Sequence, residues 1–275
     1  MMAYMLSRMG GRQMIELRFK TKSNGVPIVS KKEIEYFAEM IIDDYNPEII
    51  KNPTILDIED FLEFYVGLEI DYKDLTHDKS IIGMMVFSDG NIIIYDAEEN
   101  KAKRIRVNEG TILIDNSLLQ EKLLARGRFT LCHELAHWIL HRHMFTVDKN
   151  QISLFDDIEE EKEPIIKCRN TDIEYNNKRK FRTDNDWLEW QADYMASALL
   201  MPKNIFINIV KKEFNNIGIK DGFYQKGTSL KTDLSIEELC VRLAKIFNVS
   251  VIAAEIRLKN LGLIIEQQSN EQLRL

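Results

Sequence analysis

The chain has 275 residues, enough to bury a substantial core and to form one large domain or two smaller ones. With 45% apolar and 29% charged residues it has the composition of a soluble globular protein, and its net charge of −7 argues against a general binder of nucleic acids or anionic membranes. Three cysteines without a Cys-x-x-Cys pair, no secretory signal and no apolar run long enough to span a membrane predict a cytoplasmic protein.

The first quarter of the chain predicts a weakly ordered lead-in over residues 1–30, with one strand near 15–19. A helix over 30–45 follows, because its first residues, Ser-x-x-Glu, match the pattern of a capping box. A second, short helix is predicted over 57–65, where a glycine soon ends it.

The middle of the chain predicts a small, largely antiparallel sheet. Residues 81–87 and 91–95 flank a Ser-Asp-Gly turn, which is a strong hairpin signal. Residues 104–107 and 111–115 flank an Asn-Glu-Gly turn and are expected to form two further strands.

The rest of the chain predicts helices and one charged insertion. The helices are expected over residues 120–142, 187–200, 202–214, 235–247 and 250–261. The insertion, over 145–185, contains an acidic run and a basic run. Its simplest interpretation is a solvated excursion, and a substrate-contact rim or a patch for nucleic acid or acidic peptide are the alternatives. We expect one domain over 31–225 and a C-terminal helical segment over 226–275 packed on that domain.

The predicted helix over 120–142 contains the motif His133-Glu134-x-x-His137. Residues four apart share one face of a helix, so the two imidazoles can bind the same metal ion. Glu134 lies about 100° further round the helix axis, where a general base would stand. The helix is otherwise apolar nearly all round and should be buried, so a bound cation would satisfy its polar stripe.

A catalytic zinc site needs a third protein ligand, and the sequence offers two candidates. His143 follows His137 at the spacing of a longer zinc motif, but that motif needs glycine where Leu140 stands here. Glu189 belongs to the predicted helix over 187–200. Like the helix over 120–142, this helix is largely apolar and has a polar stripe on one face.

If Glu189 is the third ligand, Asp193, one helical turn further on, would hydrogen-bond one of the metal-binding imidazoles. A structural alternative exists for both carboxylates. Glu189 can close a helix cap with Asp186, and Asp193 can be a surface residue.

Two segments, RFTLCHELAHWILH at 128–141 and EWQADYMASALLMP at 189–202, together closely resemble the ImmA/IrrE family of zinc metallopeptidases. The resemblance implies a zincin-like, gluzincin-type α+β fold with a small antiparallel sheet, an active-site helix and a C-terminal helical hairpin. It implies one catalytic Zn²⁺ held by His133, His137 and Glu189. It also implies that Glu134 assists the attack of zinc-bound water on a peptide bond, in a helix-turn-helix repressor of a mobile element or a stress response.

The residue that would stabilise the oxyanion stays open. The candidates for this or another substrate contact are His141, His143, Tyr194 and Arg126, and a structural role is the alternative for each.

Two other functions are alternatives to proteolysis. The chain could be a non-proteolytic regulatory or toxin–antitoxin partner, or a DNA-binding regulator that uses its C-terminal helices. These helices, over 235–261, resemble a helix-turn-helix unit, but their charges nearly cancel, which favours an ordinary helical hairpin. We therefore expect a protein substrate, no membrane contact and no direct nucleic-acid binding. The oligomeric state is not determined by the sequence.

Overall fold

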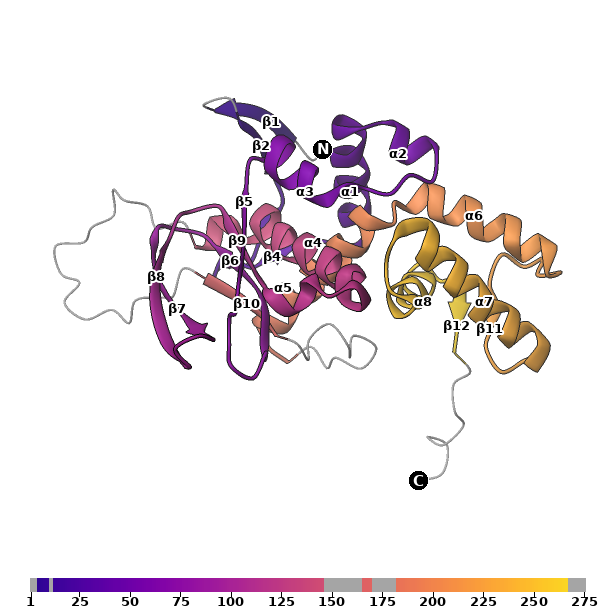
Figure 1. Cartoon of the computed structure of the whole chain (residues 1–275). Helices are drawn as coiled ribbons and strands as arrows, with labels where there is room; N and C mark the ends of the chain where they lie inside the picture. The colour runs from indigo at the N-terminus through magenta and orange to yellow at the C-terminus, as the bar shows by residue number, and fades with distance from the viewer. Residues whose placement is uncertain (1–3, 10–11, 146–164, 170–181, 267–275) are drawn as a thin grey trace, which may run out of the picture.

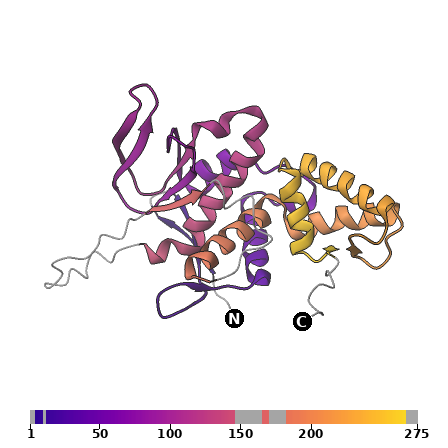
Figure 2. The ribbon, with the colours of Figure 1, turned by 90° about the horizontal axis from the view of Figure 1, so that it is seen from below.

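The computed structural model describes residues 4–9, 12–145, 165–169 and 182–266. The fold is mixed α+β, and two long helices, α4 (Leu124–His141) and α5 (Asp184–Leu200), lie side by side at its centre (Figure 1). Figure 2 shows the C-terminal helices on one side of the molecule, opposite a two-stranded ribbon formed by β7 (Gly90–Asp96) and β8 (Lys101–Val107). Among the described residues, no helix is both long and apolar enough to cross a membrane.

The first described residues form two antiparallel strand pairs. These pairs are β1 (Tyr4–Met9) with β2 (Arg12–Leu17), and β3 (Lys20–Thr21) with β4 (Pro27–Ile28). Leu17 of β2 is buried, and so are Val26 and Val29 beside β4. The described part of residues 1–30 therefore forms four strands, where the sequence predicted a single one.

The next helices follow their sequence signals. In α1 (Lys31–Tyr45) the predicted capping box is confirmed, because Ser30 and Glu33 each bond the other's backbone N–H. Two short helices come next: α2 (Glu48–Lys51) and α3 (Ile58–Asp60), the second continuing into the π-helical turn η1 (Phe61–Val66). Gly67 ends this turn with a φ of +80°, a left-handed conformation that suits glycine.

The central sheet has four strands in the order β10-β6-β9-β5 and is mixed. Its strands are β5 (Glu69–Lys73), β6 (Ile81–Val86), β9 (Thr111–Asp115) and β10 (Ile165–Arg169). β5 runs parallel to β9, whereas β6 runs antiparallel to both β9 and β10. Of the three strand pairings, two are antiparallel, as expected for a largely antiparallel sheet, and the pairing of β5 with β9 is parallel.

The predicted hairpin of residues 81–87 with 91–95 is wrong, whereas the two further strands predicted over 104–107 and 111–115 are present as β8 and β9. β7 (Gly90–Asp96) pairs with β8 (Lys101–Val107) in a separate two-stranded ribbon, and β6 and β9 pair with each other. The turn signals mark where the chain reverses, but burial decides the partners. The strands β6 and β9 are almost wholly buried and belong to the centre, whereas β8 is mostly exposed.

The second half of the described chain is helical. After α4 and α5 come α6 (Lys203–Asn216), α7 (Leu230–Phe247) and α8 (Val251–Asn260). α7 begins earlier than predicted because Ser229 caps it by accepting a hydrogen bond from the N–H of Thr232. The remaining short elements are η2 (Asn116–Leu119), η3 (Glu121–Leu123), η4 (Arg142–Met144), β11 (Tyr224–Gln225) and β12 (Ile264–Ile265).

One hydrophobic core joins α1, α4, α5 and the C-terminal helices. Its members include Phe37 of α1, Leu135 of α4, Leu199 of α5 and Phe247 of α7, all almost completely buried. The C-terminal helices therefore pack on the same body as the central sheet. Within the predicted insertion the structure describes only residues 145, 165–169 and 182–185. The acidic run at 156–163 and most of the basic run at 178–182 lie outside the described residues.

Candidate metal centre

Helix α4 positions the first half of the centre. It packs along α5 and across β6 and β9, so nearly every face of it is covered. The side chains of His133, Glu134 and His137 are all 0% exposed. Three polar side chains without solvent need partners inside the protein, since an unpaired buried polar group costs a few kcal/mol.

Helix α5 positions the second half. Thr183 caps this helix and forms a capping box with Asp186, so Glu189 has no part in the cap and the structural alternative for it is wrong. Glu189 is instead one turn further in, buried at 6% exposure and facing α4. Asp193 is buried as well, so it is not a surface carboxylate.

The two helices bring His133, His137 and Glu189 together. The Nε2 atoms of the two imidazoles are 3.0 Å apart, and the Glu189 oxygens lie 3.3 Å from His133 Nε2 and 3.6 Å from His137 Nε2. Ligand atoms that bind a tetrahedral zinc at about 2.0–2.1 Å lie roughly 3.3 Å from one another. The spacing therefore fits a single ion, and Glu189 Oε2 makes no hydrogen bond to any residue that the structure describes. These three residues form a group able to hold a metal ion.

The outward-facing nitrogen of each imidazole is also engaged. His133 Nδ1 lies 2.9 Å from Asp193 Oδ1, as the sequence predicted for a carboxylate one turn beyond Glu189. His137 Nδ1 lies 2.9 Å from Nδ1 of His141. Partners of this kind fix the orientation of a metal-binding imidazole.

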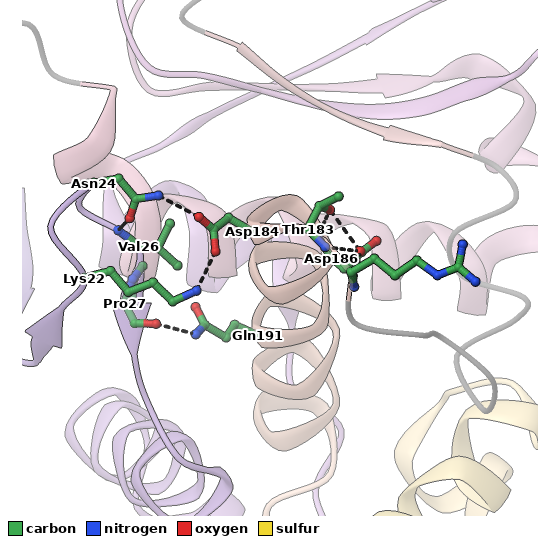
Figure 3. A network of polar contacts seen from close by, with 9 residues as sticks. Lys22, Asn24, Val26, Pro27, Thr183, Asp184, Asp186 and Gln191 are labelled. Atoms are coloured by element: carbon green, nitrogen blue, oxygen red, sulfur yellow. Dashed lines mark hydrogen bonds and ion pairs between the residues drawn. The ribbon is translucent and has the colours of Figure 1, made fainter.

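His141 is in turn bound to a residue that sequence reasoning missed. Its Nε2 lies 2.9 Å from Oε1 of Gln191, whose amide nitrogen donates to the carbonyl oxygen of Pro27 at 2.9 Å (Figure 3 shows this last contact). The polar Gln191 on an apolar helix was a usable signal, whereas nothing in the sequence pointed to Pro27. Since both ring nitrogens of His141 face these partners, His141 is not placed to contact a substrate.

Burial keeps these histidines neutral. It lowers the pKa of His137 well below the ordinary value of 6.5, and it lowers that of His141 to about 3. A neutral imidazole keeps one nitrogen lone pair, which is what metal binding requires.

Glu134 lies against β6 and is close enough to Glu189 of α5 for the two carboxylates to interact. Its carboxylate lies against Gly83, because a methyl group there would come within 2.6 Å of Glu134 Oε1. The pKa of Glu134 is raised to about 8, mainly by burial and in part by the neighbouring Glu189, against the lowering effects of His133 and the Met85 backbone. Neither carboxylate oxygen makes a hydrogen bond of normal geometry to a described residue.

The remaining candidates lie elsewhere. His143 is exposed, donates from Nε2 to the carbonyl oxygen of Gly25 at 2.9 Å and packs edge-on against Phe19, so it is not the third ligand. Tyr194 donates its hydroxyl to Glu35 at 2.8 Å, in a network that also includes Arg257. Arg126 is half-buried in the first turn of α4, about two turns before the first histidine of the motif.

The fold and the site together define a mixed α+β protein with a buried His-His-Glu group that can hold a metal ion. Compared with known proteins, the chain matches no protein-family model and no curated protein.

Proposed function

We propose that the chain is a zinc-dependent endopeptidase with a zincin-like fold of the ImmA/IrrE type. The observation that carries the proposal is the convergence of His133 and His137 from α4 with Glu189 from α5. A fourth buried group, Glu134, lies beside them, and neither of its carboxylate oxygens makes a hydrogen bond of normal geometry within the described part of the chain. Two neutral imidazoles and one carboxylate, with a carboxylate nearby to move protons, are the donor set of many catalytic zinc sites.

The residues present divide the chemistry between them. A bound zinc supplies a Lewis acid that lowers the pKa of water and polarises a peptide carbonyl. Glu134 takes up the proton of the attacking water and passes it to the leaving amine, as a carboxylate with a pKa near neutrality can do in both directions. Asp193 and His141 hold the two imidazoles in place.

Burial of the centre favours selective cleavage over general proteolysis. His133, Glu134 and His137 are fully buried, so a peptide reaches them only after neighbouring segments move. A protein partner that induces this opening would restrict cleavage to few sites. By resemblance, the substrate class is a helix-turn-helix repressor.

Metal analysis of three purified proteins tests the zinc assignment. We expect about one zinc per chain in the wild type and in Glu134→Gln, which keeps all three ligands, but far less in Glu189→Ala. Full metal retention by Glu189→Ala would remove Glu189 from the ligand set. Co-expression with a candidate repressor should then give repressor fragments with the wild type and none with Glu134→Gln.

The same experiment separates the proposal from the non-proteolytic alternative, in which the repressor is bound but stays intact with both proteins. The DNA-binding alternative loses support from α8, because its Arg257 is 0% exposed and paired with Glu35. A buried arginine cannot contact phosphates. A steep salt dependence of binding to duplex DNA would reverse this choice.

A further inference from the structure

The second ligand, His137, is held by a chain of three hydrogen bonds that ends on the main chain. The bonds run from His137 to His141, from His141 to Gln191 and from Gln191 to the carbonyl oxygen of Pro27, each at 2.9 Å. All three side chains are at most 1% exposed, so water does not compete for these bonds.

Which group donates in each of these three hydrogen bonds follows from the last bond, to Pro27. A backbone carbonyl can only accept, so the group of Gln191 that faces Pro27 must be the NH₂. The amide oxygen of Gln191 therefore faces His141 and can only accept from it. This requires the proton of neutral His141 to be on Nε2, which leaves its Nδ1 as an acceptor.

The same reasoning continues to the metal ligand. Since His141 Nδ1 accepts, His137 must donate from Nδ1, and its Nε2 then carries the free lone pair. That atom is the one that faces His133 and Glu189. The hydrogen bonds that begin at Pro27 therefore select the tautomer of His137 that a metal ion needs. This conclusion makes no use of the metal itself.

Pro27, the last group in this series of hydrogen bonds, is itself held in place. Pro27 begins β4, and the β3–β4 hairpin is fastened to the first turn of α5 (Figure 3). Lys22 Nζ and Asn24 Nδ2 both bind the carboxylate of Asp184, at 2.5 Å and 2.6 Å. The N-terminal hairpin and the helix that carries Gln191 are therefore held in one arrangement.

We infer that Gln191 is a positioning residue that acts through His141 to fix the tautomer and orientation of His137, an inference that rests on the proposed metal centre. His133 reaches the same state directly through Asp193. The two imidazoles are therefore held differently. His133 bonds to one carboxylate, whereas His137 is held by two uncharged side chains in series, His141 and Gln191.

The first test uses the wild type alone, without metal. The chain has only five histidines, so the imidazole nitrogens can be assigned by ¹⁵N NMR. We expect protonated Nδ1 and unprotonated Nε2 in His137, and the opposite tautomer in His141. The opposite tautomer in either ring would overturn the inference, whatever the protein does with zinc.

The second test measures zinc affinity by competition with a chelator. Gln191→Leu removes both bonds of Gln191 at similar volume and should weaken zinc binding by about 10- to 100-fold, the usual effect of losing such a partner. Tyr194→Phe is the matched control, because it removes a different buried hydrogen bond from the same helix and should leave the affinity unchanged.

A double variant shows whether Gln191 acts through His141. If it does, Gln191→Leu should add little to the loss caused by His141→Phe, since both break the same chain. Fully additive losses, or wild-type affinity in Gln191→Leu, would overturn the inference. A wild type that binds no zinc would instead overturn the proposed function, and the tautomer measurement would still test the relay.

Discussion

Arg257 of α8 and Glu35 of α1, 222 positions apart in the chain, form a buried bidentate ion pair with N–O distances of 2.6 Å and 2.8 Å. Arg257 also donates to the carbonyl oxygen of Met201, and Tyr194 donates to Glu35. The pair joins the C-terminal helices to the body that carries the metal group, so the two should unfold together.

Removing Arg257 should therefore destabilise the whole protein. In Arg257→Leu, the buried carboxylate of Glu35 loses its cation, which costs about 3–5 kcal/mol in comparable cases. Denaturant unfolding should show this loss in a single transition. The matched control is Arg242→Leu, whose pair with Glu213 is largely exposed and should cost less than about 1 kcal/mol. A separate early transition of the C-terminal helices in Arg257→Leu would contradict this.

Gly83 is expected to set the position of Glu134. In Gly83→Ala the new methyl group would lie 2.5 Å from Thr130 Cγ2 and 2.6 Å from Glu134 Oε1, so the carboxylate must shift. We expect peptide hydrolysis to fall by about 10²-fold, as for a displacement of roughly 1 Å, while the zinc content stays normal. Gly90→Ala is the control, because open space surrounds that position. Equal activity in both variants would show that Glu134 is not constrained by β6.

The stability of the metal-free protein should depend on pH through Glu134. Its pKa is raised from the ordinary 4.5 to about 8 in the folded state, so the folded state binds more protons than the unfolded one between these values. Stability is therefore lost as the pH rises through this window.

The lowered pKa values of His137 and His141 act in the opposite sense near and below pH 6.5, equally in the wild type and in Glu134→Gln, so the difference between the two proteins isolates Glu134. From pH 6.5 to 8 the wild type should lose roughly 1.5 kcal/mol relative to Glu134→Gln. Chemical denaturation of both proteins in chelator, at several pH values, gives the comparison. Parallel slopes in the two proteins would rule out this origin.

Asp193 should tune zinc affinity through His133. In Asp193→Asn the amide oxygen can still accept from Nδ1, but the negative charge that strengthens this bond is lost. We expect zinc binding to weaken by about 10-fold, at the lower end of the range for such partners. Competition with a chelator measures this directly, and an unchanged affinity would mean that hydrogen bonding alone supports the ligand.

Much of the centre could be predicted from local patterns. The spacing of His133, Glu134 and His137 placed them on one buried helix, and the polar stripe on a second apolar helix pointed to Glu189 and Asp193. Strand pairing could not be predicted in the same way, because the turns after β6 and before β9 gave the reversals of the chain without the partners. Of the N-terminal strands only one was predicted, near 15–19, since the apolar pattern of this segment is weak.

By itself, the sequence determined which side chains share a helix face, because helical periodicity fixes this from spacing alone. The sequence thereby identified the side chains that each of the two helices contributes to the His-His-Glu group. Only the tertiary structure decided that the halves face each other, that Pro27 and Gln191 orient His137, and that Arg257 pairs with Glu35. These contacts join segments distant in the chain, and such contacts leave no periodic trace in one sequence.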